Sequence, residues 1–282
     1  MSNKILVLDA TGNIGSHLID LLKNKGADFL AGTSSNTREE SHHISIDFAD
    51  VLSIEKAMKG MDTLFMLMPT HPDMVQWGKN IVSSAQKSGI KHIVRLSAAI
   101  AKNDLDLDFM KKIREIDNSV INSGLNYTII APQFFMQNLS TLMADDYKNG
   151  TLYLPAGDGK LGWIDVRDIA LVSMEILLNP EKYKNETLTI TGTESLSYGE
   201  AVEQMNNILG KDTQYIAIPD DAAIQGMTEK QFPPFFIDVM MDLNHATVLG
   251  YAEELTDTVE KITGKKPISF KEFVINNKSV WS

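Results

Sequence analysis

The chain has 282 residues, of which 43% are apolar, and its formal net charge is −11 at pH 7. This length suits one large domain or a core domain with a smaller cap, and the apolar fraction allows a sizeable buried core. We expect no nucleic-acid partner, because the chain is acidic without a basic run and phosphate binding needs clustered Lys and Arg. The absence of cysteine excludes disulfides, thiolate metal sites and cysteine nucleophiles. No signal-peptide pattern and no membrane-length apolar run is visible, so we expect a soluble cytoplasmic protein with no membrane partner.

Short apolar runs alternate with longer amphipathic stretches over roughly the first 180 residues. Continuous apolar runs of this kind predict parallel strands that are buried on both faces. The runs are 5–8, 29–31, 44–46, 64–68, 93–96 and 127–131.

Helical patterns lie between these runs, and several end at a glycine. The segments 13–25, 72–88 and 108–122 are followed by Gly26, Gly89 and Gly124, which are typical helix C-caps. Pro72 is expected to begin the second of these helices, and Ser53 to cap a short helix over 54–59. Strands that alternate with helices predict a doubly wound parallel sheet of the Rossmann type.

The spacing changes after about residue 185. A strand over 187–190 is expected to be followed by a helix that Ser197 caps and Gly210 ends. The remaining elements are a strand-like run at 215–218 and helical patterns at 220–226, 233–250, 256–262 and 269–275. We therefore predict an α/β core over 1–185 and a smaller, mostly helical C-terminal cap over 186–282, with 165–190 packing back on the core.

Gly12 and Gly15 lie between the first predicted strand and the first helix. A glycine lets the backbone approach a pyrophosphate, and the helix N-terminus supplies free N–H groups and the positive end of its dipole. The second glycine allows the helix and strand to pack closely. The pattern favours a dinucleotide site, and the alternative is a tight turn with only a structural role.

The loop resembles that of a known family. Residues 9–15, D-A-T-G-N-I-G, resemble the G-A-T-G-x-x-G loop of the NmrA-like group of atypical short-chain dehydrogenases. Further segments of the chain agree with this family in order: 47–50 (D-F-A-D), 60–65 (G-M-D-T-L-F), 123–132 (S-G-L-N-Y-T-I-I-A-P), 163–170 (W-I-D-V-R-D-I-A) and a C-terminal tail from 255 to 273. The resemblance covers nearly the whole chain. It implies a Rossmann core, a small cap and NAD(P) bound at the strand ends.

The resemblance also implies which residues hold the cofactor. They follow the first four strands and are Asp9, Thr11, Gly12, Asn13, Ile14, Gly15, Ser34, Asp47, Phe48, Met68 and Pro69.

Asp9 replaces the first glycine of the family's loop. A carboxylate beside the cofactor would repel its phosphates, by about 1 kcal/mol in water and about 4 kcal/mol near a protein surface for unit charges about 4 Å apart. We therefore expect weakened NAD(P) binding. The alternative is that Asp9 points away and bonds a backbone N–H.

The acid–base pair of typical short-chain dehydrogenases, Y-x-x-x-K, is missing. Those positions fall on Phe109 and Ile113, neither of which can move a proton. Lys112 and its neighbours Lys111 and Arg114 could substitute only after a shift in register, and they otherwise form an exposed helix face. Ser97, in place of the family's serine after the fifth strand, could position a substrate or simply form a turn.

The end of the second strand usually selects between NAD and NADP. The segment 32–38, G-T-S-S-N-T-R, contains no carboxylate, and Ser34, Ser35 and Arg38 could hold a 2′-phosphate. The sequence therefore leans towards NADP, although a plain polar loop is the alternative.

Other candidate groups have weaker support. His71 follows the fourth strand and could donate a proton, or it could be an exposed linker. No set of His, Asp and Glu has metal-ligand spacing, so no metal site is expected. Phe134, Phe135 and Asn138 follow the sixth strand, where the family's substrate cleft lies. The predicted cap contains a group of large apolar side chains: Phe232, Phe235, Phe236, Met240 and Met241. They form the core of the cap, or some of them line an apolar pocket for a flat substrate such as a quinone.

These features together predict an NAD(P)H-dependent oxidoreductase that passes hydride to a small, quinone-like acceptor. Hydride transfer to a quinone does not need a tyrosine acid, because water can protonate the product. Two alternatives stay open: a non-catalytic NAD(P) sensor that acts on a protein partner, and a scaffold that has lost cofactor binding. Thermal shift with both cofactors and NADPH oxidation against quinones would separate the three.

Overall fold

The computed structural model describes residues 3–34, 42–103 and 105–282. Two compact units divide the chain, each built from several segments. Unit 1 comprises 1–98, 112–131 and 169–188, and unit 2 comprises 99–111, 132–168 and 189–282. The division predicted from the sequence, with a core over 1–185 and a cap over 186–282, stays a prediction.

A seven-stranded sheet in the order β3-β2-β1-β4-β5-β6-β9 organises unit 1. Its strands are β1 (Lys4–Val7), β2 (Asp28–Thr33), β3 (His43–Ser45), β4 (Thr63–Met66), β5 (His92–Leu96), β6 (Asn126–Pro132) and β9 (Glu186–Ile190). The neighbours from β3 to β6 pair in parallel, with Ile5 opposite Phe29 on one side and Thr63 on the other. The doubly wound sheet expected from the apolar runs is confirmed.

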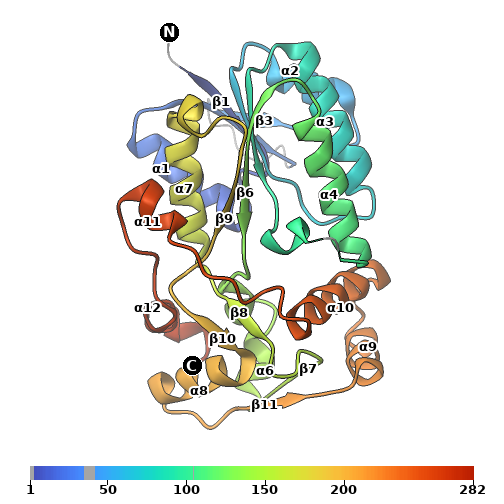
Figure 1. Cartoon of the computed structure of the whole chain (residues 1–282), viewed down its shortest axis with the longest axis vertical. Helices are drawn as coiled ribbons and strands as arrows, with labels where there is room; N and C mark the ends of the chain where they lie inside the picture. The colour runs from blue at the N-terminus through green and yellow to red at the C-terminus, as the bar shows by residue number, and fades with distance from the viewer. Residues whose placement is uncertain (1–2, 35–41, 104) are drawn as a thin grey trace. The chain divides into compact units, whose positions relative to one another are not determined.

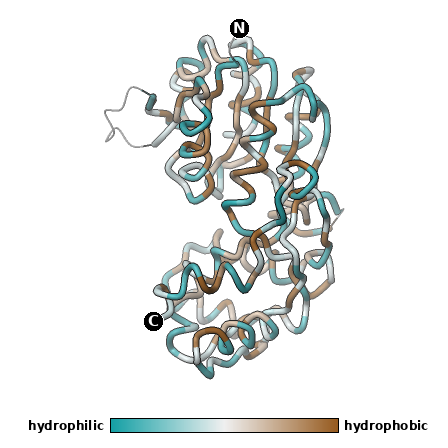
Figure 2. The backbone as a smooth tube through the Cα atoms, turned by 90° about the vertical axis from the view of Figure 1, so that its left-hand side faces the viewer, coloured by the Kyte–Doolittle hydropathy of each residue, from teal (hydrophilic) through white to brown (hydrophobic). Residues whose placement is uncertain are grey.

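Helices cover both faces of this sheet, as Figure 1 shows, with α1 and α7 on one face and α2, α3 and α4 on the other. Their bounds are α1 (Asn13–Asn24), α2 (Val51–Met58), α3 (Met74–Ser88), α4 (Asp108–Ile121) and α7 (Val166–Leu178). Because both faces are covered, β1 is fully buried from Ile5 to Val7. The tube in Figure 2 shows the same pattern, with apolar strands and helices whose turns alternate between polar and apolar.

Two helix starts differ from the prediction. The α2 N-cap is Asp50, whose carboxylate accepts from the Leu52 N–H at 2.9 Å, so the expectation for Ser53 was wrong. Ser53 lies inside the helix, where its hydroxyl bonds the backbone of Asp47. Helix α3 begins at Met74 rather than at Pro72, because His71 and Pro72 form a turn that precedes it.

Unit 2 contains two small sheets surrounded by helices. Strand β7 (Thr151–Leu154) pairs in parallel with β11 (Gln214–Ala217), and β8 (Lys160–Gly162) pairs antiparallel with β10 (Ser195–Ser197). The helices are α5 (Gln137–Ser140), α6 (Ala144–Lys148), α8 (Tyr198–Leu209), α9 (Asp220–Glu229), α10 (Pro234–Val248), α11 (Thr258–Thr263) and α12 (Phe270–Asn276). Short 3₁₀ turns lie at Ala99–Lys102, Pro180–Tyr183 and Lys278–Val280.

The capping of α8 matches the prediction. Ser197 accepts from the Glu200 N–H, and the Glu200 side chain bonds the Ser197 N–H in return. Gly210 ends the helix in a left-handed conformation at φ 68°. Among the described residues, no helix combines the length and apolar character needed to cross a membrane.

Candidate functional site

The turn after β1 has the close packing that the glycine spacing predicts. Gly12 is the N-cap of α1 in an extended conformation, without a side-chain cap. A Cβ on Gly15 would lie 2.1 Å from the Asp9 carbonyl oxygen and 2.8 Å from the Ala10 Cα. Only glycine fits there, because both contacts are with backbone. The first N–H groups of α1 therefore open directly onto the turn, without an intrahelical acceptor.

Asp9 has a left-handed backbone conformation, which glycine adopts without strain. Its φ is 52°, in the left-handed region that non-glycine residues adopt at a cost of about 1 kcal/mol. Its carboxylate lies over the turn, since a Cβ on Gly12 would meet Asp9 Oδ2 at 2.6 Å. Among the described residues this carboxylate makes no hydrogen bond or ion pair, and burial raises the pKa of Asp9. The alternative in which Asp9 bonds a backbone N–H is therefore not what the structure has.

A hollow of about 350 Å³ lies at the carboxyl ends of β1 to β4. Parallel strands end at the same edge of a sheet, and this edge of doubly wound folds is where ligands bind. The lining comes from all four strand ends and from α3: Leu8, Asp9, Gly32, Thr33, Ser34, Ser45, Ile46, Asp47, Phe48, Pro69 and Trp77. Five of the predicted cofactor residues thus lie together, namely Asp9, Ser34, Asp47, Phe48 and Pro69.

Aromatic side chains form one wall of this hollow. Phe48 and Trp77 stack with ring centroids 5.6 Å apart, and His71 stacks on Trp77 at 4.1 Å. The Nδ1 of His71 accepts from the Asp73 N–H, so one ring nitrogen is already engaged in the turn. Flat apolar faces of this kind suit an adenine ring.

The polar lining comes from strand ends. Thr33 is the last residue of β2, and Ser34 follows it. The Oδ1 of Asp47 accepts from the Ala49 N–H at 2.9 Å, in a local turn. The predicted phosphate contacts Ser35 and Arg38 lie outside the described residues.

The remaining predicted loop residues occupy different surroundings. Thr11 and Asn13 are exposed at the start of α1, whereas Ile14 and Gly15 are buried beneath it. Met68 is partly buried in the loop after β4 and does not line the hollow.

Ser97, at the end of β5, belongs to a buried polar cluster. Its hydroxyl donates to Asp117 Oδ2 on α4, and Asp117 Oδ1 lies 3.4 Å from the Nε of buried Arg95. Burial raises the pKa of Asp117, although Arg95 and Ser97 oppose that shift. Ser97 is therefore held by a carboxylate rather than by a turn alone.

The helix register of the missing acid–base pair is apolar in the structure. Ile113 is 5% exposed and Phe109 is partly buried in α4. Lys111 is exposed and forms ion pairs with Asp106 and Asp108, and Lys112 is partly buried. No proton-transfer pair stands at the two family positions.

The predicted substrate residues all belong to unit 2. Phe134 is 8% exposed and meets Trp163 edge-on at 6.3 Å, so little of its surface is open to a ligand. Phe135 and Asn138 are partly exposed, and the Asn138 N–H bonds the Phe135 carbonyl at 3.2 Å.

Thr33, Trp77 and Asp117 were missed by sequence reasoning. Thr33 directly precedes a predicted residue, and Trp77 lies one turn into α3 from the His71 loop. Asp117 interrupts the apolar stripe of Ile113, Ile116 and Val120, and a carboxylate in such a stripe is a signal for a buried polar group.

A glycine turn, a helix N-terminus and an aromatic hollow at the strand ends define a protein with the dinucleotide-binding type of Rossmann domain. The chain belongs to the NmrA-like family, which it matches over residues 1–274. It is 32% identical over 275 residues to the NAD(P)H azoreductase of Xenophilus azovorans, covering 95% of this chain and 96% of that protein.

Solved structures share the fold. An NADPH-dependent quinone oxidoreductase from Escherichia coli, complexed with NADPH, superposes with a TM-score of 0.88 at 17% identity, covering 96% of this chain and 99% of the other. NmrA, a negative transcriptional regulator in complex with NADP, superposes with a TM-score of 0.77 at 16% identity, covering 99% of this chain and 97% of the other.

Proposed function

We propose that the acceptor of this NAD(P)H-dependent oxidoreductase is a small, quinone-like molecule and that NADP(H) is its preferred cofactor. The observation that carries the proposal is the hollow at the ends of β1 to β4, together with the glycine turn beside it. Family membership and the azoreductase relative support the reaction class.

The chain's residues fit a dinucleotide. The open N-terminus of α1 and the turn over 9–15 suit a pyrophosphate, and the Phe48–Trp77 wall suits an adenine. Thr33 and Ser34 would face the adenosine ribose or its 2′-phosphate. This set of hydroxyls, with no carboxylate in the segment 32–38, supports the lean towards NADP.

The choice of acceptor follows from proton chemistry. When bound, the reduced nicotinamide supplies a hydride, and a quinone then needs only one proton, which water can give, to become a hydroquinone. The positions of the family's acid–base pair hold Phe109 and Ile113, so an alcohol or sugar substrate would lack its proton donor. The Ser97 hydroxyl donates its one hydrogen to Asp117, so we propose Ser97 as a positioning group that offers its oxygen and not as a donor. Within unit 2, Phe135 and Asn138 stay proposed contacts of the acceptor.

The test combines binding and turnover. Thermal unfolding should shift upwards with NADPH and less with NADH, and NADPH should be oxidised when a panel of quinones is added. Trp77→Ala should weaken NADPH binding by about tenfold, since stacking on a base contributes about 1–3 kcal/mol. Ile121→Ala, an exposed α4 position, is the matched control.

Other results would identify the alternatives. A thermal shift without turnover of any quinone would favour a dinucleotide sensor acting on a protein partner. No shift with either cofactor would favour a scaffold and would overturn the proposal.

A further inference from the structure

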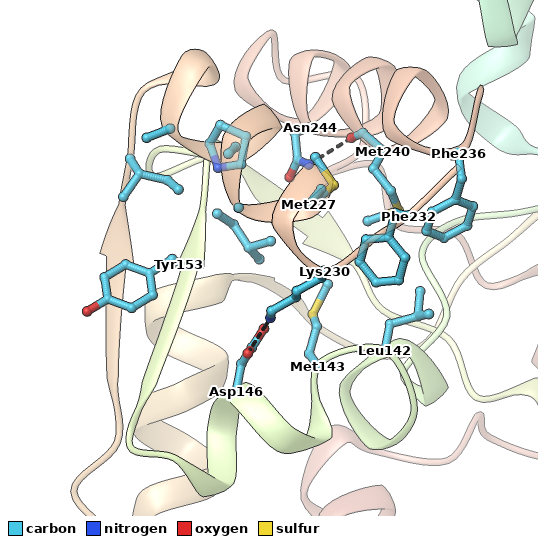
Figure 3. Close-up of a pocket in the computed structure, with 16 residues that line it drawn as sticks. Leu142, Met143, Asp146, Tyr153, Met227, Lys230, Phe232, Phe236, Met240 and Asn244 are labelled. Carbon is cyan, nitrogen blue, oxygen red and sulfur yellow. Dashed lines mark hydrogen bonds and ion pairs between the residues drawn. The ribbon is translucent and has the colours of Figure 1, made fainter. Parts of the chain in front are cut away.

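A second hollow, of about 360 Å³, lies wholly within unit 2 and is shown in Figure 3. Its walls come from α6, β7, α9, α10 and the segments that join them. Of the cap side chains expected to be core or pocket lining, Phe232, Phe236 and Met240 line it, whereas Met241 is buried in a cluster with Ala223 and Ile237.

The hollow exists because one helix face is too small to fill it. Helix α9 contributes the small residues Ala222, Ala223 and Gly226 to the lining, which also includes the large side chains Phe232 and Met240. A Cβ on Gly226 would have no heavy atom within 4 Å. The hollow is open to solvent at its rim, where Ala222, Tyr153 and Lys230 are exposed, so a molecule can enter it and contact its apolar walls.

One buried amide gives the hollow a polar contact. Asn244 on α10 is 4% exposed, and its Nδ2 donates to the Met240 carbonyl at 2.7 Å. This bond fixes the orientation of the amide, because a flipped oxygen would face a carbonyl. Asn244 Oδ1 accepts no hydrogen bond from the described residues. It is also not one of the fully enclosed polar atoms that lack a partner, so part of its surface is open and a molecule in the hollow can reach it.

The rim has a paired charge rather than a free one. Lys230 Nζ binds both carboxylate oxygens of Asp146, at 2.7 and 2.9 Å, as the dashed lines in Figure 3 show. The hydroxyl of Tyr153 belongs to a side chain that is 53% exposed. With the lysine neutralised, the lining favours an uncharged ligand over an anion.

We propose that this hollow binds an uncharged aromatic molecule that carries one O–H or N–H donor, a phenol or naphthol, with the donor on Asn244 Oδ1. The apolar walls supply affinity for the ring system, and the single acceptor supplies selectivity for the donor. A quinone has only acceptor oxygens and cannot make this bond, whereas the hydroquinone can. The site thus distinguishes a molecule with a donor from its oxidised form, and it does so without the cofactor.

The direct test is calorimetry on the full chain without nicotinamide, using 1-naphthol and its methyl ether, 1-methoxynaphthalene. The two probes share the ring, and only the naphthol can donate. We expect naphthol to bind about tenfold more tightly, as one hydrogen bond into a buried acceptor allows. Equal affinities for both probes, or no binding of either, would overturn the proposal.

Three variants locate the site. Asn244→Leu should remove the tenfold preference while keeping the affinity for the ether. Gly226→Leu should place a side chain in the hollow and weaken both probes at least tenfold, while thermal unfolding shows that the fold is kept. Ile224→Ala is the matched control, since Ile224 is on the same helix, is 41% exposed and does not line the hollow. Unchanged naphthol binding in the Gly226→Leu variant would place the ligand elsewhere and would refute the assignment.

Discussion

The two compact units fill their interiors with different side chains. In unit 1 the buried strands are mainly aliphatic, and Ile5, Leu6, Val7 and Leu8 are each fully enclosed. The largest enclosed side chains of unit 2 are instead aromatic and make edge or tilted contacts: Tyr147, Trp163, Tyr198, Phe270, Phe273 and Trp281. A broad sheet buries continuous apolar strands, whereas two small sheets and short helices need large rings to close their core.

The hollows differ for the same reason. In unit 1 the space is made by backbone, where strands end and turns begin, and its lining mixes carboxylates, hydroxyls and rings. In unit 2 the space lies beside small residues of α9, and its lining is mainly apolar, with Asn244, Tyr153 and the Lys230–Asp146 pair as its polar side chains. The first lies beside Gly15, which tolerates no substitution, and the second is lined by Gly226, which does.

The largest expected effect tests the backbone origin of the unit 1 hollow. Gly15→Ala should lower the free energy of unfolding by about 3 kcal/mol or more, because the new Cβ would meet the Asp9 carbonyl and neither backbone can move freely. NADPH binding should be lost with it. Gly26→Ala is the control: its Cβ meets nothing within 4 Å, and only its φ of 65° opposes the change, by about 1 kcal/mol. Similar losses in chemical denaturation of both variants would break this explanation.

One buried group in each unit should also respond to acid in the opposite direction from the other. Burial lowers the pKa of His92 in unit 1 from 6.5 to about 4. Its stabilising effect is therefore present above pH 6.5 and is lost as the pH falls towards 4. Burial raises the pKa of Asp168 in unit 2 from 3.8 to about 6, so its effect is present below pH 3.8 and is lost as the pH rises through 6. Each shift corresponds to about 3 kcal/mol, which solvent screening lowers to on the order of 2 kcal/mol.

Non-titrating variants separate the two effects. His92→Gln keeps a donor towards Thr128 Oγ1, and Asp168→Asn keeps an acceptor for the Ile268 N–H. From pH 7 to pH 4, the free energy of unfolding should rise in His92→Gln relative to wild type and fall in Asp168→Asn relative to wild type. Parallel curves for all three proteins would mean that neither group carries the pH dependence.

Asp9→Gly tests whether the carboxylate opposes cofactor binding. Removing a like charge and a strained φ should tighten NADPH binding by about tenfold and raise the free energy of unfolding by about 1 kcal/mol. In wild type the affinity should also rise as the pH is lowered, because burial raises the pKa of Asp9 and the neutral acid no longer repels phosphate. Asp9→Asn, which keeps the strain and removes the charge, should reproduce only the gain in affinity. Titrations that show no tightening in either variant would leave Asp9 without a role in binding.

The fold was predictable because local and long-range signals agree. Apolar runs predicted the parallel strands, and Ser197 with Gly210 predicted both ends of α8. The sequence did not reveal β7, β8 and β10, because strands of three or four residues have few positions for a periodic pattern. Of the described strands in the two small sheets, β11 alone was predicted, from the run at 215–218. The predicted start of α2 was wrong for a different reason. Asp50 and Ser53 are both residue types that cap helices well, and only the backbone conformation decides which of them is the N-cap.

The candidate site was predictable only where topology fixes it. Asp9, Asp47 and Pro69 lie together because each directly follows a parallel strand, and the order of strands brings those ends to one edge. Trp77 and Asp117 reach their places through helix rotation and packing, which no motif in the sequence encodes. The conformation of Asp9 could not be predicted either, because non-glycine residues rarely adopt a positive φ.

The smallest effect sharpens the comparison most directly, because it uses one substitution in each unit. Gly78 in α3 and Gly226 in α9 are both helical, and alanine favours a helix over glycine by about 1 kcal/mol. A Cβ on Gly78 would lie 2.9 Å from Cγ2 of the buried Ile116, a stiff β-branched side chain, so Gly78→Ala should lower the free energy of unfolding by about 1 kcal/mol overall. Gly226→Ala meets open space and should raise it by about 0.5–1 kcal/mol. Denaturant midpoints that move in the same direction in both variants would mean that the α9 hollow is filled in solution, and the distinction between the two units would fail at that point.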